Sequence, residues 1–222
     1  MEDASCGGDE VQLHGGILVR PEARHRVFSP SELARCARRL LEGLYLIGRH
    51  TSEAADLALE ILTSTDTNSW LNMIKQGATA TMEAWTPEEK PNASWSHPWC
   101  SGPNSVIIRL LLGVKPIVPG WARFEFAPQP SSLEWINASA PTGKGAIPVS
   151  ISQTSSAMRA EISVPEGTAA RVCLPPAHGL SATLAQAQKL TVNGAAVATV
   201  VDGRMLCGKS DLAAGHYTLE RT

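Results

Sequence analysis

Residues 119–126 read PGWARFEF, and this short stretch decides the fold because the periodicity of the chain changes there. In an extended chain, positions 121, 123 and 125 point to one side, and Ala122, Phe124 and Phe126 point to the other. This period of two predicts a strand with one apolar face. The residues before it follow helical spacing, and those after it continue as short alternating segments. The stretch therefore marks a boundary between two kinds of structure.

The segment after this boundary is predicted to consist of strands. Turn signals separate its apolar alternating segments, and Asn193-Gly194 is the strongest hairpin signal among them. Besides the first strand, strands are predicted at residues 133–138, 147–153, 158–164, 169–174, 190–192, 197–201 and 216–220. About eight strands separated by turns are typical of an antiparallel β-sandwich. We therefore predict a C-terminal β-sandwich domain over residues 119–222.

The segment before the boundary has helical patterns. Apolar residues recur at spacings of three and four between residues 33 and 45, and further helical patterns follow at residues 52–62, 70–74 and 101–113. The last pattern is apolar on most sides, which predicts a position inside a helical assembly, yet about four helices are too few to cover it. Residues 29–118 are therefore predicted to be part of a helical domain, and residues 1–28 remain unassigned. The fold class is α+β, with helices followed by a sandwich.

Composition excludes several classes of protein. The chain has 222 residues, of which 43% are hydrophobic and 18% are charged, so it can form a core and is not predicted to be disordered. Its formal net charge of −2 argues against nucleic-acid binding, and it contains no apolar run of about 18 residues that could cross a membrane. The acidic start lacks the features of a signal peptide. The localisation stays unknown, with the cytoplasm favoured.

The five cysteines, at positions 6, 36, 100, 173 and 207, are widely spaced and form no C-x-x-C pair. This spacing does not predict a zinc site. An odd number of cysteines without a secretory signal favours free thiols in a reducing compartment. Five of the six histidines have no carboxylate or cysteine at a metal-ligand spacing, and no phosphate-binding glycine loop is present. We therefore expect neither a metal nor a cofactor.

The chemistry is expected between residues 77 and 104. Four of the six tryptophans lie between residues 70 and 99, in the same part of the chain as Glu83 and His97. A tryptophan ring can stack on the C–H face of a sugar, while Glu and His side chains bind hydroxyls and transfer protons. The alternative is that the tryptophans belong to the core and that Glu83 is a paired structural carboxylate, since tryptophan is mostly buried in proteins.

The motifs of this stretch resemble a known family. Residues 77–85, GATATMEAW, and residues 94–99, SWSHPW, are similar to the end of the catalytic barrel of the α-L-rhamnosidases. In that family, a connecting segment leads from the last barrel helix into the C-terminal sandwich. This chain is similar to that segment at residues 111–116, 119–121 and 126–130. The resemblance extends over about residues 33–222. It implies a partial (α/α)6 barrel followed by an antiparallel β-sandwich.

The resemblance also implies an activity, the inverting hydrolysis of terminal α-L-rhamnosyl residues. Glu83 matches the general base of the family, and His97 matches a histidine that contacts the rhamnose. Trp85 and Trp95 match apolar walls of the pocket. The base of an inverting enzyme lies on the face of the sugar opposite the leaving group, with room for one water molecule.

The sequence departs from the family because no motif for the general acid is recognisable upstream of Glu83. Glu88 and Glu89 are rival carboxylates, but such a pair in a polar loop between prolines is usually solvated. One carboxylate cannot perform both roles of an inverting hydrolysis. We therefore expect a C-terminal part of a rhamnosidase-like protein that is inactive alone. Its expected ligand is a rhamnose-containing glycoside, and its expected partner is a missing barrel half or a second copy. The alternative is a non-catalytic carbohydrate-binding or partner-binding remnant of this fold.

Overall fold

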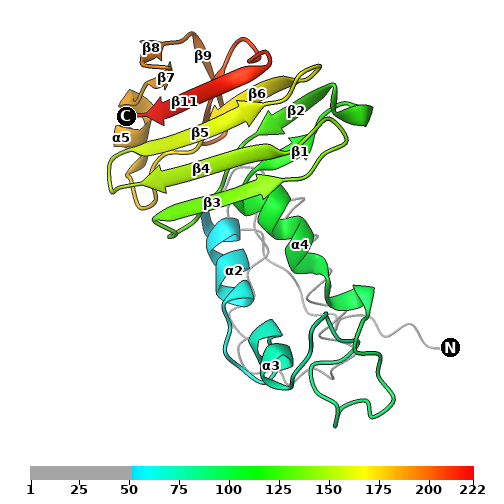
Figure 1. Ribbon diagram of the computed structural model, residues 1–222. Coiled ribbons are helices and arrows are strands. Elements are labelled where there is room, and N and C mark those ends of the chain that lie inside the picture. Colours follow the sequence, from blue (N-terminus) through cyan, green and yellow to red (C-terminus); the bar gives the residue numbers. More distant parts are fainter. Residues whose placement is uncertain (1–51) are drawn as a thin grey trace, which may run out of the picture.

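The structure, a computed structural model, describes residues 52–222. A group of helices lies below a β-sandwich, and the chain passes once from the helices into the sandwich (Figure 1). The predicted helix between residues 33 and 45 and the unassigned residues 1–28 lie outside the described residues. The predicted order of helices followed by a sandwich is confirmed.

The three helical segments that the sequence predicts within the described residues are helical in the structure, and a short 3-10 turn precedes the last of them. The elements are α2 Ser52–Leu62, α3 Trp70–Lys75, the 3-10 turn Pro98–Cys100, α4 Gly102–Val106 and its continuation as a π-helix, Ile107–Leu111. The start of α3 is fixed by Ser69, whose hydroxyl accepts a hydrogen bond from the backbone N–H of Asn72 at 3.1 Å. A serine at this position satisfies one of the N–H groups that a helix start leaves without a partner.

Two sheets form the sandwich, ordered β1-β2-β6-β10-β9 and β3-β4-β5-β11-β7-β8. Their strands are β1 Val114–Pro116, β2 Arg123–Phe126, β3 Trp135–Ala140, β4 Ile147–Gln153, β5 Met158–Val164, β6 Ala169–Leu174, β7 Leu190–Val192, β8 Ala195–Ala196, β9 Thr199–Asp202, β10 Met205–Gly208 and β11 Gly215–Arg221. The paired strands described here are antiparallel except β2 and β6, which run parallel.

The bounds of β4, β5, β6 and β7 are those that the sequence predicts, and the hairpin at Asn193-Gly194 joins β7 to β8. The sequence prediction lacks four elements, which are β1, β8, β10 and the short helix α5, Ala182–Ala187. Strand β1 lies before residue 119. It pairs with β2, and Val114 lies opposite Phe126 in this pair. Strands β1 and β10 lack the alternation of buried and exposed residues by which strands such as β4 are predicted.

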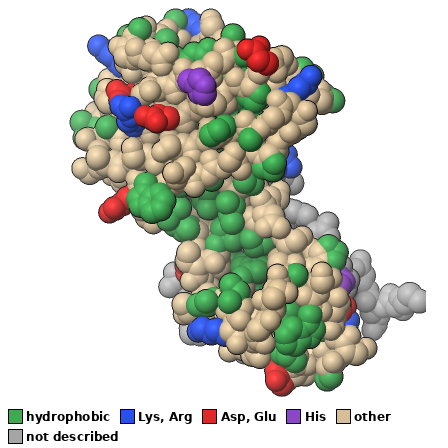
Figure 2. Space-filling model, viewed as in Figure 1, with side chains coloured by type: hydrophobic (Ala, Val, Ile, Leu, Met, Phe, Trp, Pro, Cys, Tyr) green, Lys and Arg blue, Asp and Glu red, His purple; other side chains and the backbone are tan. Residues whose placement is uncertain are grey.

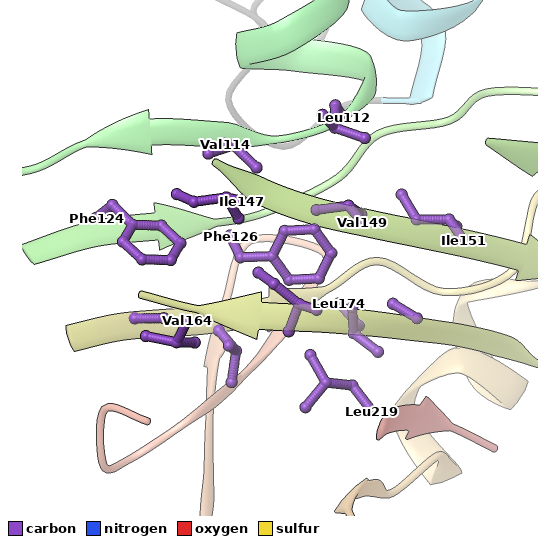
Figure 3. Packing of buried hydrophobic residues seen from close by; sticks show 14 of the residues in the cluster. Leu112, Val114, Phe124, Phe126, Ile147, Val149, Ile151, Val164, Leu174 and Leu219 are labelled. Carbon is purple, nitrogen blue, oxygen red and sulfur yellow. The ribbon is translucent and has the colours of Figure 1, made fainter. Parts of the chain in front are cut away.

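The inner faces of the two sheets form one continuous core. Strand β4 alternates buried and exposed residues, and it directs Ile147, Val149 and Ile151 toward the opposite sheet. Figure 3 shows them facing the rings of Phe124 and Phe126 from β2. This alternation is the physical basis of the predicted sandwich, because each strand buries one apolar face.

The helices join the sandwich through apolar packing and a few polar contacts. Leu112, at the end of the π-helix, is fully buried in the sandwich core, and hydrophobic side chains gather where the two parts meet (Figure 2). Asp56 of α2 accepts a hydrogen bond from the hydroxyl of Ser131 and contacts Nε2 of His178 at 3.1 Å. The backbone N–H of Gln129 donates to the carbonyl of Leu110 at 3.1 Å. The last helix and the sandwich are therefore built as one packed unit.

The expectation of free thiols is wrong for two of the cysteines. Cys173 of β6 and Cys207 of β10 face each other across neighbouring strands and form a disulfide. The sequence could not reveal this pair, because 34 positions separate the two residues and β10 itself was not predicted. Cys100 is a buried free thiol. Within residues 52–222, no helix is both long and apolar enough to span a membrane.

Candidate active site

The predicted site residues lie in the irregular segment between α3 and α4, at the end of the molecule away from the sandwich (Figure 1). Two backbone contacts close this segment at its base. The N–H of Glu83 donates to the carbonyl of Ser94 at 2.9 Å, and the N–H of His97 donates to the carbonyl of Thr81 at 2.7 Å. The Thr81 hydroxyl also donates to the His97 carbonyl at 2.8 Å. These contacts bring Glu83 and His97, which are distant in sequence, to one place.

The Glu83 carboxylate has two strong partners. Lys90 forms an ion pair with Oε1, and the backbone N–H of Ser94 donates to Oε2 at 2.9 Å. The hydrogen bond from Lys90, followed by that from Ser94, holds the pKa of Glu83 below its usual value. The side chain remains 13% exposed, so a ligand can still reach it. The geometry thus gives an accessible, ionised carboxylate, which can accept a proton but cannot donate one at neutral pH.

The neighbouring Glu89 has a structural role. Its Oε2 accepts hydrogen bonds from the backbone N–H groups of Trp85 at 3.1 Å and Thr86 at 3.3 Å, and its own N–H donates to the Thr86 hydroxyl at 3.4 Å. Thr86 and Glu89 therefore satisfy each other's backbone groups, as in a capping box. The T-x-x-E spacing could have predicted this. Glu88 is exposed, as expected of a solvated carboxylate.

The tryptophans divide into buried and exposed rings. Trp85 is only 2% exposed and packs edge-on against Trp70, with 5.3 Å between the ring centroids. Trp70 is held by a 2.7 Å hydrogen bond from its Nε1 to the carbonyl of Cys100. Trp95, in contrast, is 45% exposed. Trp95 thus offers a ring to a ligand, whereas Trp85 has the environment of a core residue, and the pocket-wall role of Trp85 stays a prediction.

The thiol near the site, Cys100, is not a candidate nucleophile. Burial raises the pKa of the Cys100 thiol to about 11, so at neutral pH it is protonated and is a poor nucleophile. Among residues 52–222, no group of three or more His, Cys, Asp or Glu side chains could hold a metal ion.

Lys90 is a site residue that the sequence analysis missed, because no motif marks a lysine seven positions after a carboxylate.

Comparisons with known proteins place both halves of the chain in one family. A family model described as the bacterial α-L-rhamnosidase six-hairpin glycosidase domain matches residues 43–109. A second model, the bacterial α-L-rhamnosidase C-terminal domain, matches residues 113–189. The two matches follow each other in the chain and together cover almost two thirds of it. This chain belongs to the α-L-rhamnosidase family. The segment with Glu83 and His97 lies within the match to the glycosidase domain.

Individual relatives agree with the family assignment. An α-L-rhamnosidase from Alteromonas sp. (strain LOR) is 34% identical over 131 residues, which are 55% of this chain and 14% of the relative. The structure of α-L-rhamnosidase from Dictyoglumus thermophilum is similar with a TM-score of 0.69 and 20% identity, over 85% of this chain and 20% of that one. The Streptomyces avermitilis enzyme complexed with L-rhamnose has a TM-score of 0.63 and 19% identity, over 82% and 17% of the two chains.

The structural similarities establish the fold, and the family matches establish the kinship. This rhamnosidase-family chain spans about a seventh of the curated relative and about a fifth of the Dictyoglumus structure. The prediction of helices from a six-hairpin barrel followed by a β-sandwich is confirmed at this level.

Proposed function

We propose that this chain supplies the general base of an inverting α-L-rhamnosidase site, and that Glu83 is that base. The observation that carries the proposal is the state of the Glu83 carboxylate, which is accessible, ionised and oriented by Lys90 and the Ser94 N–H. A general base must be deprotonated at the working pH and must have a fixed direction toward the proton that it takes. His97 and the exposed ring of Trp95 lie on the segment that closes over Glu83 and would contact the sugar.

In the proposed mechanism, Glu83 removes a proton from a water molecule, and the water oxygen attacks the anomeric carbon from the face opposite the leaving group. A separate carboxylic acid must protonate the leaving oxygen. In our proposal this acid comes from outside these 222 residues. The substrate class, α-L-rhamnosides, is proposed from the names of the relatives, one of which is complexed with L-rhamnose.

The test uses a hybrid protein in which this chain replaces its matched segment in the Alteromonas α-L-rhamnosidase. Glu83→Gln should lower kcat on p-nitrophenyl α-L-rhamnoside by about 10²–10⁴-fold, the scale of losing a positioned base. Glu88→Gln is the matched control, because Glu88 is an exposed carboxylate of the same loop, and it should keep full activity. The first product seen by NMR should be the β-anomer. Near-complete activity in Glu83→Gln, or an α-anomer as the first product, would contradict the proposal.

A second function, binding of another helical polypeptide, is favoured by the apolar side chains that the helices expose. Ile74 is 66% exposed and Ile107 is 41% exposed, although Met73 and Val106, which directly precede them, are buried. Apolar surface of this kind is typical of a face that another chain covers. Association that rises with concentration in sedimentation velocity, and that falls in an Ile74→Ser variant, would support this function. A monomer at all concentrations would contradict it.

A further inference from the structure

The outer face of the six-stranded sheet carries a feature that the proposed rhamnosidase site does not use. An open hollow of about 350 Å³ lies on this face, bordered by side chains from β3, β4, β5 and β11 and by Asn193 after β7. The side of the sandwich seen in Figure 2 carries scattered charged, histidine and hydrophobic side chains and no single large hydrophobic patch. The hollow is part of the sandwich, whereas Glu83 lies in the helical part.

Strand pairing arranges the polar side chains of the hollow in a line. Asn137 faces Ser150, Ser150 faces Glu161, and Glu161 faces Thr218, each on the next strand. Neighbouring strands are about 4.8 Å apart, so the line extends over about 14 Å. Across the four strands, the line presents in order an amide, a hydroxyl, a carboxylate and a second hydroxyl. In the part of the chain that the structure describes, the side chains of Asn137 and Ser150 make no hydrogen bond to protein, which leaves them available to a ligand.

An exposed aromatic ring stands at one end of this line. Trp135 lies two residues before Asn137 on β3 and therefore points to the same side of the sheet. Its side chain is 69% exposed, although Ile136 beside it packs against the core. Strand β3 is an edge strand, so a ligand can pass over the ring without meeting another strand. A flat ring next to a row of hydrogen-bonding groups is the arrangement that recognises a pyranose, which has an apolar C–H face and hydroxyls at its edge.

The charged groups of the face are held by one another. Arg159 donates to Glu161 at 2.9 Å and to Glu220 at 2.7 Å, and the Ser163 hydroxyl contacts Nδ1 of His216 at 2.7 Å. These contacts fix the direction of the Glu161 oxygens before a ligand arrives, which lowers the entropy lost on binding. Two carboxylates for one guanidinium also disfavour a polyanionic ligand. The face is therefore suited to an uncharged ligand rich in hydroxyl groups.

We infer that the outer face of the six-stranded sheet binds a neutral saccharide chain. The ring of Trp135 stacks on one pyranose unit, and Asn137, Ser150 and Glu161 hydrogen-bond the hydroxyls of the units that follow across the sheet. This site would hold a polysaccharide and is separate from the sugar pocket proposed at Glu83. A protein partner fits the face less well, because its exposed apolar groups, such as Trp135 and Pro148, are separated by polar side chains, whereas the core of a protein interface is apolar.

The test is electrophoresis of the 222-residue chain in native gels that contain one neutral polysaccharide each, namely a rhamnan, a galactomannan or a xyloglucan. We expect retarded migration in at least one gel. Trp135→Ala should lower the association constant at least about tenfold, as for a central aromatic contact. Asn137→Ala should lower it about fivefold, the scale of one hydrogen bond. Leu184→Ala is the matched control, because it truncates an exposed apolar side chain on α5, outside the face, and should leave retardation unchanged.

Each other outcome overturns the inference. No retardation in any gel would show that the face holds none of these neutral chains. Retardation that is lost in Trp95→Ala but kept in Trp135→Ala would assign the binding to the helical part. If Trp135→Ala instead abolishes self-association in sedimentation velocity and leaves retardation unchanged, the face is a protein interface. Since Trp135 is largely exposed, the variant should keep the melting temperature of the parent chain, which circular dichroism can verify.

Discussion

The sandwich and the helical part of this rhamnosidase-family chain differ in how they bury their apolar residues. The sandwich has one continuous core, which includes both phenylalanines of β2 and the inner faces of β4 and β5 (Figure 3). The described helical part has small separate clusters, one around Met82 and Trp85 and another around Ala58 and Leu110. The sandwich therefore has a large core of its own, although Trp135 and Val201 stay exposed, while the described helices bury few residues together and leave Ile74 exposed.

This difference shows which contacts stabilise each part. A two-sheet domain closes when both inner faces are covered, and this chain supplies both. Helices with a small shared core gain most of their stability from packing against other elements, because short helices are weak on their own. The candidate site lies in the helical part, which has the smaller apolar core of the two. Its geometry depends on a few hydrogen bonds of residues 81–97, and within residues 52–222 the last helix and α2 connect the helical part to the sandwich.

The largest effect is expected from Phe126→Ala. Phe126 is fully buried between the sheets, and its loss should lower the free energy of unfolding of the sandwich by about 3–5 kcal/mol. Hydrogen exchange followed by mass spectrometry should show faster exchange in β2, β4 and β6. Met82→Ala is the comparison variant, because Met82 is just as buried but belongs to a small cluster. It should speed exchange only around residues 70–100. Equal effects of both variants on all peptides would mean that the chain is a single cooperative unit.

Removal of the disulfide should have the next largest effect. In the chain-entropy treatment, a bond that closes a loop of 34 residues stabilises the folded state by about 3–4 kcal/mol. A Cys173→Ala, Cys207→Ala double variant should lose about that much in urea unfolding. Cys100→Ala is the control, since Cys100 is buried but unpaired, and it should lose about 1 kcal/mol. If iodoacetamide labels Cys173 and Cys207 in the unfolded, unreduced chain, the disulfide is absent and the expected loss disappears.

A smaller effect should follow from Gly113→Ala at the junction of the two parts. Gly113 has a φ of +77°, and a Cβ there would lie 2.2 Å from the backbone carbon of Ala127, so the backbone must move. We expect a loss of at least about 2 kcal/mol. Gly120→Ala separates the two causes, because Gly120 has a φ of +73° but no atom near the added Cβ, and it should lose about 1 kcal/mol. Similar losses in both variants would mean that the close contact at the junction is unimportant.

The sequence predicts the sandwich better than it predicts the site. Alternation reveals strands such as β4 and β5 because their inward residues must be apolar. It fails for β1 and β10, because β1 buries only one residue and β10 buries three consecutive residues, so neither alternates. The parallel pairing of β2 with β6 was not predictable either, since local pattern does not encode which strand lies beside which.

At the candidate site, residue types could be predicted but not their partners. The stretch around Glu83 and His97 is marked by its composition and by its family resemblance, and the fold brings both residues together. Burial was not predictable. Trp85 and Trp95 have similar sequence surroundings, yet one ring is buried against Trp70 and the other is exposed. Such differences depend on packing between segments, which a single sequence does not record.

The smallest effect, and the sharpest test of the comparison, concerns the pH dependence of the hybrid enzyme. Lys90 is the main cause that lowers the pKa of Glu83, so Lys90→Met should raise that pKa. A general base must be deprotonated, and the acid limb of the kcat/KM profile should therefore move to higher pH, with little loss at neutral pH. Lys75→Met, which removes an exposed lysine of α3, should leave the profile unchanged. An acid limb that does not move in Lys90→Met would mean that Glu83 is not the titrating base. In that case the helical part of this chain would not supply the base of the site.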